Sequence, residues 1–163
     1  MPPARGLLLG VDPGLAATGW ALLDANATVA SCGTIRTEPG PAAPRLLRVA
    51  EELRGILGSW EVEEAALEEL FMGRNATSAL GVAQARGVVL VTLAAAGVRV
   101  YEYKPSQVKA ALTGYGMAGK AQMGRMLALQ LRVREGLDDH AADAVAIALC
   151  HSRGRRLRLV TQL

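Results

Sequence analysis

The sequence predicts an α/β fold with a mixed five-stranded sheet, whose first three strands are antiparallel, flanked by helices. Two observations carry this prediction. The apolar run that begins at Leu7 is ended by Pro13 and Gly14, which is typical of a central strand buried on both faces. Further along, three closely linked strand segments give way to alternating helical and extended patterns, which favours one sheet covered by helices.

The first three strands are expected over residues 7–12, 18–23 and 28–37. The link at 24–26 is only a few residues long, and links of this length join antiparallel neighbours. The remaining strands are expected over 62–70 and 98–103, the second of which alternates with a period of two. We expect the 62–70 strand to lie beside the first strand and parallel to it.

Five helices are expected from apolar spacing, capping residues and prolines at helix starts. Their ranges are 44–60, 76–97, 105–112, 120–131 and 137–149. The 76–97 segment is so apolar that it has little polar face and must be covered on several sides. Dimerisation through it and burial against its own sheet are both open at this point.

Length and composition bound the class of protein. A chain of 163 residues suits one domain, here residues 1–163, and can bury a substantial core. No apolar run reaches about 18 residues, so we expect no membrane span, and no secretory signal pattern opens the chain. Cys32 and Cys150 have neither metal-site spacing nor disulfide density, which suits the cytoplasm.

The net charge of +3 is unevenly distributed. Residues 151–163 form a basic C-terminal tail with four arginines and no acid, whereas the remainder is slightly acidic. Any affinity for nucleic acid must therefore come from local patches or from this tail, which could equally have no such role.

The candidate chemistry is carboxylate-based. Asp12 ends the first strand, where open α/β sheets place their ligands, and either Glu68 or Glu69 ends the fourth. The last helix carries Asp143 on an alanine-rich packing surface, and a buried acid there needs a cation. Converging carboxylates without cysteine suit hard ions such as Mg²⁺ or Mn²⁺, and two such ions would clamp an in-line phosphoryl displacement.

Several polar residues near the expected site also have purely structural interpretations. Asp12 could hydrogen-bond the amides of the turn that follows it. Asp138 and Asp139 could simply oppose the dipole at the start of the last helix. His140, taken alone, is more often a cap or a surface residue than a metal ligand.

Aromatic and basic residues near these acids suggest contacts to nucleic acid. Phe71, in the segment after Glu68, could stack on an unpaired base or plug the core. Lysines at 104, 109 and 120 could contact phosphates, although a solvated lysine is the commoner case.

Five motifs together resemble those of the RuvC family, whose members are Holliday-junction resolvases with a ribonuclease-H-like fold. The motifs cover about Leu7 to Leu149 in the family's order and spacing. They are Gly10-Val11-Asp12-Pro13-Gly14, Leu67-Glu68-Glu69-Leu70-Phe71-Met72, Gln84-Ala85-Arg86-Gly87, Gln107-Val108-Lys109 and His140-Ala141-Ala142-Asp143-Ala144.

The resemblance implies a set of catalytic and metal-binding residues. Asp12, Glu68 and Asp143 match three of the family's four such positions. The fourth falls on His140, where many members have aspartate and some have histidine. This departure removes one negative charge and could shift the metal preference toward Mn²⁺.

The resemblance also implies residues that contact DNA. Phe71 matches the aromatic residue that opens the junction, and Arg74 a basic residue on the DNA strand. Lys109 and Lys120 match basic positions near the scissile phosphate.

The implied function is metal-dependent resolution of Holliday junctions in recombination and repair. Two Mg²⁺ or Mn²⁺ ions would serve each active site and leave a 5′-phosphate. The implied partners are four-way junction DNA, a second copy in a homodimer, and a branch-migration helicase of the RuvA and RuvB type, in the cytoplasm. The rival interpretations are an actin-like ATPase, for which the chain is too short, a non-catalytic junction-binding module, and a ribonuclease-H-like nuclease acting on RNA.

Overall fold

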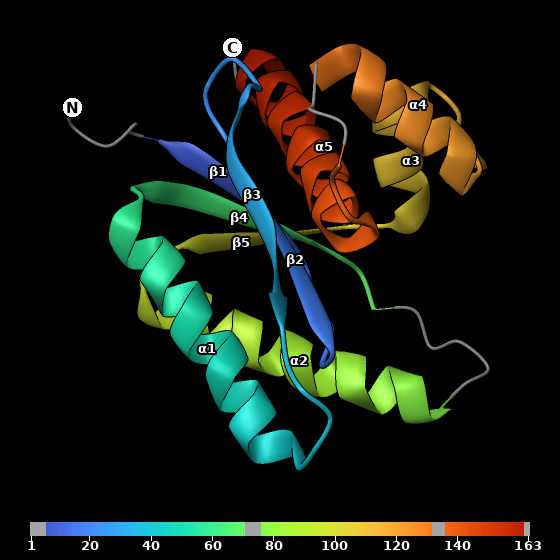
Figure 1. The fold of residues 1–163 in the computed structure, drawn as a ribbon. Helices are drawn as coiled ribbons and strands as arrows, with labels where there is room; N and C mark the ends of the chain where they lie inside the picture. The colour runs from blue at the N-terminus through green and yellow to red at the C-terminus, as the bar shows by residue number, and fades with distance from the viewer. Residues whose placement is uncertain (1–5, 71–75, 132–135, 162–163) are drawn as a thin grey trace.

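A five-stranded sheet, in the order β3-β2-β1-β4-β5, forms the centre of the molecule (Figure 1). The computed structural model describes residues 6–70, 76–131 and 136–161. The strands are β1 (Leu7–Asp12), β2 (Ala17–Leu23), β3 (Val29–Arg36), β4 (Val62–Glu68) and β5 (Arg99–Tyr103). β1, β2 and β3 pair antiparallel, whereas β4 runs parallel to β1 and β5 parallel to β4. The predicted mixed sheet is therefore confirmed.

Helices cover both faces of this sheet. They are α1 (Ala42–Ser59), α2 (Ala76–Ala95), α3 (Pro105–Thr113), α4 (Lys120–Leu131) and α5 (Asp139–Thr161). Figure 1 shows α1 and α2 on one face, and α5, with α3 and α4 beside it, on the other. Every element lies within two residues of its expected bounds except at the C-terminal end of α5.

The face toward α1 and α2 holds the larger aliphatic core. Alternate residues of β1 point toward it, among them Leu9 and Val11, both fully buried. Val49 and Leu53 of α1 and Val89 of α2 pack against them. Because successive strand residues point to opposite faces, Asp12 faces the other side of the sheet.

The face toward α5 is lined by very small residues. Gly10 in β1 and Gly19 in β2 have no side chain, and Ala21 and Ala66 continue the same surface. A methyl group on Gly19 would collide with the backbone carbonyl of His140. The backbone of α5 therefore lies almost directly on the sheet, which brings the side chains of its first turns to the ends of β1 and β4.

The apolar helix α2 packs on the sheet along one side only. Within the described residues, Thr77–Ala95 is the one stretch long and apolar enough to cross a membrane by composition, and 28% of it is buried. Ala85, Val89 and Leu93 form the buried stripe against the sheet, whereas Leu80 is 61% exposed. Burial against its own sheet is thus observed, and an uncovered apolar side remains.

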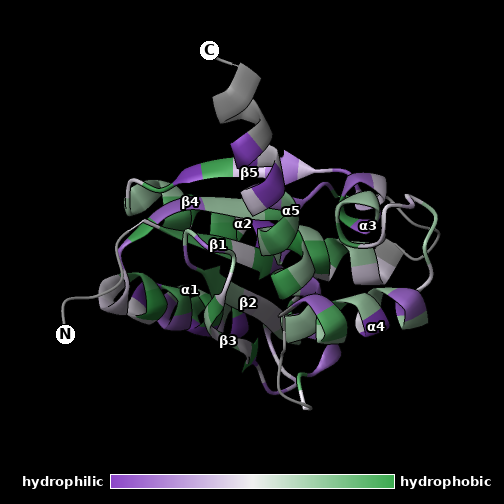
Figure 2. Cartoon of the chain, turned by 90° about the horizontal axis from the view of Figure 1, so that it is seen from above, coloured by the Kyte–Doolittle hydropathy of each residue, from purple (hydrophilic) through white to green (hydrophobic). Residues whose placement is uncertain are grey.

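Helix α5 continues well beyond the predicted Leu149. It runs to Thr161, so residues 151–161 of the segment predicted to be a basic tail are instead part of this helix. His151 and Ser152 are buried in the interior. Figure 2 shows the helix becoming hydrophilic after these residues, where it leaves the sheet toward the C-terminus.

Candidate active site

Two carboxylates lie at the same end of two adjacent parallel strands. Val11 of β1 is paired with Leu67 of β4, so the next residues, Asp12 and Glu68, end their strands side by side. Both follow residues that face α1 and α2, and therefore both point toward α5. The expectation that Glu68 comes close to Asp12 is met, whereas its neighbour Glu69 is exposed.

The start of α5 adds His140 and Asp143 to this end of the sheet. The helix begins here because Asp138 caps it: its Oδ1 accepts the backbone N–H of Ala141 at 2.9 Å. Thr34 donates to the same oxygen at 2.7 Å, which ties the cap to β3. These hydrogen bonds, that from Ala141 foremost, lower the pKa of Asp138 to about 2, so its structural role is the one observed.

Asp12 and His140 contact each other directly. Nδ1 of His140 lies 3.3 Å from Oδ2 of Asp12, so the imidazole lies directly beside this carboxylate. Burial raises the pKa of Asp12 above its usual value, and the hydrogen bond and charge of His140 only partly offset this. In the described residues, Asp12 therefore bonds to α5 rather than to its own turn.

The surroundings of Glu68 and Asp143 disfavour the ionised form of both carboxyls. Burial raises the pKa of both carboxyls, and the charge of Asp12 raises each of them further. Asp143 itself also raises the pKa of Glu68. Three acids from β1, β4 and α5 thus repel one another around a single pocket of about 350 Å³.

The chemistry of these donors fits a hard divalent cation. Carboxylate oxygens are the preferred ligands of Mg²⁺, and a cation between them would relieve both the repulsion and the cost of burial. Among the residues that the structure describes, no three His, Cys, Asp or Glu side chains lie close enough together to hold a metal ion as they stand.

Two lysines line the same pocket. Lys109 of α3 faces Glu68 and lowers its pKa, which partly counters the effect of burial. Lys120 opens α4, and its Nζ lies 3.0 Å from Oδ2 of Asp139. Its ammonium group also lowers the pKa of Asp143. Both predicted lysines are therefore beside the acids, and Asp139 is the partner of one of them.

The structure reveals a role for Arg86 that the sequence reasoning left unassigned. Its guanidinium donates to the carbonyl oxygen of Glu68 at 2.7 Å and pairs with Glu102. It also lines a second pocket of about 210 Å³ on the other side of Asp12 and Glu68. The sequence did contain an indication of this role: Arg86 is the one charged residue in the apolar Thr77–Ala95 stretch, and a charge in such a setting requires a partner.

Two of the predicted DNA-binding residues, Phe71 and Arg74, lie outside the described residues.

Comparison with known proteins identifies the family. A family model described as crossover junction endodeoxyribonuclease RuvC matches residues 8–151. A relative of that name from Roseiflexus is 49% identical over 149 residues, covering 88% of this chain and 89% of its own. This chain belongs to the RuvC family. A RuvC from Thermotoga petrophila is 42% identical over 159 residues, covering 94% of this chain and 96% of its own.

Solved structures agree with this assignment. Thermus thermophilus RuvC in complex with a Holliday junction substrate has a TM-score of 0.87 at 34% identity, covering 94% of this chain and 97% of its own. The yeast mitochondrial Holliday junction resolvase is similar in fold, with a TM-score of 0.66 at 11% identity. The sheet and its helices thus have the ribonuclease-H-like architecture of RuvC.

Proposed function

We propose that this chain is a structure-specific endodeoxyribonuclease that resolves Holliday junctions in homologous recombination and DNA repair. The observation that carries the proposal is the single pocket that Asp12, Glu68 and Asp143 line from three different elements. The similar RuvC from Thermus thermophilus was solved with a Holliday junction substrate, which supports the same substrate class here.

The catalytic and metal-binding residues in this proposal are Asp12, Glu68, His140 and Asp143. When bound there, two Mg²⁺ or Mn²⁺ ions would supply the Lewis-acid chemistry of in-line phosphodiester hydrolysis that leaves a 5′-phosphate. Because His140 replaces a carboxylate with imidazole, the site carries less negative charge and should favour Mn²⁺ more than an all-acid site.

The protein's own cations complete the proposed chemistry. Lys109 and Lys120 line the pocket wall, where a scissile phosphate would meet both ammonium groups. Preorganised cations stabilise charge as it develops on phosphate oxygens in the transition state. We assign DNA contacts to Phe71 and Arg74 as well, on their match to family positions alone.

The apolar side of α2 fits a homodimer. Leu80 and Val91 are 61% and 64% exposed on this helix in the single chain. A second copy would cover them, and a two-fold dimer would present two active sites to a substrate that itself has two-fold symmetry. We further propose that residues 1–163 form one cytoplasmic nuclease domain, away from membranes, which acts with a helicase of the RuvA and RuvB type.

The deciding experiment is cleavage of labelled four-way junctions beside linear duplex and RNA–DNA hybrid, with Mg²⁺, Mn²⁺ or EDTA. Paired nicks confined to the junction and abolished by EDTA are expected. Tight junction binding without cleavage in either metal would instead indicate a binding module, and cutting of the hybrid would overturn the substrate.

Replacement of Asp12 tests the assignment of the site. We expect Asp12→Asn to bind junctions as the wild type does and to lose cleavage by at least about 100-fold, since even supporting residues of metal sites contribute 10–100-fold. Glu52→Gln, on α1 across the sheet, is the matched control and should cleave normally. Near-normal nicking by Asp12→Asn would refute the metal role.

A further inference from the structure

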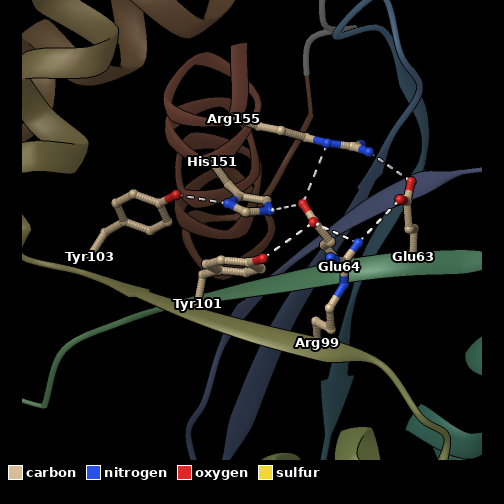
Figure 3. Close-up of polar contacts among 7 residues, drawn as sticks. All are labelled: Glu63, Glu64, Arg99, Tyr101, Tyr103, His151 and Arg155. Atoms are coloured by element: carbon tan, nitrogen blue, oxygen red, sulfur yellow. Dashed lines mark hydrogen bonds and ion pairs between the residues drawn. The ribbon is translucent and has the colours of Figure 1, made fainter. Parts of the chain in front are cut away.

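A second polar cluster joins α5 to β4 and β5, on the C-terminal side of Asp143 along α5 (Figure 3). Its centre is Glu64 of β4 and His151 of α5, whose side chains are 5% and 0% exposed. Tyr103 of β5 lies beside them and is also buried. Charged groups in such a position are costly unless each is paired, so the cluster requires an explanation.

Both nitrogens of the His151 ring are engaged. Nε2 lies 2.9 Å from Oε2 of Glu64, and Nδ1 lies 2.7 Å from the hydroxyl of Tyr103. Because an ionised carboxylate only accepts hydrogen bonds, Nε2 is the donor to Glu64. These two hydrogen bonds fix the orientation of the imidazole ring relative to β4 and β5.

Arginines surround the outer side of the cluster. Arg99 lies 3.0 Å from Oε1 of Glu64 and 3.2 Å from Oε1 of Glu63. Arg155, one turn after His151 on α5, lies 2.9 Å from Oε2 of Glu63. The attraction between α5 and β4 at this end is therefore both charged and directional.

The spacing along α5 matches the spacing along β4. Asp143 and His151 are eight residues apart on a helix, or about 12 Å. Glu68 and Glu64 are four residues apart on a strand and on the same face, or about 13 Å. Placing His151 on Glu64 consequently places Asp143 beside Glu68, and the two acids do line one pocket.

The acids of the active site repel one another, whereas Glu64 is paired with His151. At the active-site end, Asp143 and Glu68 repel each other and both are repelled by Asp12. Between the two ends, α5 meets the sheet through small apolar side chains such as Ala144 and Ala66, which offer no directional contact. The His151 cluster adds a buried, directional attraction to this interface, beyond the contacts that Asp138 and His140 make with β3 and β1.

We propose that Glu64 and His151 are positioning residues, which fix the register of α5 on β4 so that Asp143 stays beside Glu68 and the acids remain poised to bind divalent cations. The proposal rests on the proposed metal-dependent function of that site. Neither residue touches the reacting atoms, because His151 lies about 12 Å along the helix from Asp143.

The test compares two substitutions of Glu64 in the full-length chain. Glu64→Leu removes the acceptor of His151, whereas Glu64→Gln keeps a carbonyl oxygen to accept the same hydrogen bond. In both variants Arg99 and Arg155 can still pair with Glu63. Leu53→Ala is the control, since Leu53 is buried on α1 across the sheet and its truncation lowers stability without touching α5.

Mn²⁺ binding without DNA, followed by electron paramagnetic resonance of the free ion, is the primary measurement. We expect Glu64→Leu to raise the Mn²⁺ concentration at half-saturation about tenfold and Glu64→Gln by less than about threefold. Leu53→Ala should bind Mn²⁺ as the wild type does, even with a lowered Tm. On junctions, kcat of Glu64→Leu should recover as Mn²⁺ is increased, with junction affinity unchanged.

Three results would overturn the proposal: a folded Glu64→Leu that binds Mn²⁺ normally, a Glu64→Gln no better than Glu64→Leu, or a Leu53→Ala that loses as much Mn²⁺ affinity. If Glu64→Leu does not fold, Tyr103→Phe removes one hydrogen bond from His151 and should raise the same half-saturation concentration about threefold. A wild type that binds Mn²⁺ but cuts no junction would refute the proposed function and leave this comparison valid.

Discussion

Adding one methyl group to Gly19 should separate the start of α5 from the sheet. In Gly19→Ala the new Cβ would overlap the carbonyl of His140 and lie 3.1 Å from the amide nitrogen of Ala141. These are backbone atoms, so no side chain can move aside and the start of α5 itself must shift. The displacement needed to restore ordinary contact is on the order of 1 Å.

Two effects of different size should follow. Overpacking of this kind costs about 1–3 kcal/mol of the free energy of unfolding, and each kcal/mol lowers Tm by about 2–4 °C for a chain of this length. A misplacement of about 1 Å in a catalytic group can cost on the order of 100-fold in rate. Cleavage should therefore fall far more than the fraction of folded protein.

The assay is single-turnover junction cleavage at a temperature at which both proteins are folded, with Tm from thermal unfolding. Gly55→Ala is the matched control, because a Cβ on Gly55 of α1 meets nothing within 4 Å and alanine favours the helix. Normal cleavage by Gly19→Ala, or an equal loss in Gly55→Ala, would refute the reasoning that direct backbone contact places the helix.

Three further predictions concern charge and surface. Because burial and repulsion raise the pKa of Glu68, its ionisation costs stability as pH rises through the raised pKa. Glu68→Gln should therefore raise Tm in EDTA at pH 8, with a gain that shrinks toward pH 4 in a pH series of melts. Asp138→Ala should lose about 1 kcal/mol with its helix cap. That loss should be full above the unfolded pKa of 3.8 and should disappear as pH falls through about 2, which denaturant titrations would measure. Val91→Asp should give monomers in sedimentation equilibrium with unpaired nicking, whereas Leu47→Asp, on the similarly exposed surface of α1, should remain dimeric.

The sequence predicted most of the fold because its patterns are local. The apolar run of β1, the Pro13-Gly14 break and the helical spacing of α1 each involve a few neighbouring residues. Acids at strand ends or on apolar helix faces stand out locally, which singled out Asp12, Asp143 and either Glu68 or Glu69, and the family resemblance then selected Glu68. Their common pocket followed from the parallel pairing of β1 with β4.

What the sequence did not disclose depends on partners distant in the chain. Glu64 follows another glutamate, Glu63, so the local sequence predicts a solvent-exposed acid. Its buried partner, His151, is 87 residues away in the chain and cannot be recognised from this local pattern. The same interaction carries α5 past the predicted end at Leu149, because His151 is buried against Glu64 two residues further on. Arg86 is similar, since its bond to the Glu68 carbonyl crosses from helix to strand end.

The candidate active site joins the beginning of the chain to its last helix. Asp12 and His140 are 128 positions apart, yet they are in contact. During synthesis on the ribosome, the first carboxylate emerges long before the helix that completes the pocket. A nascent or prematurely terminated chain that stops before α5 would contain Asp12 and Glu68 but no His140 or Asp143. Translation products that stop before α5 therefore lack half of the proposed catalytic residues, and the candidate site is assembled only after α5 has been made.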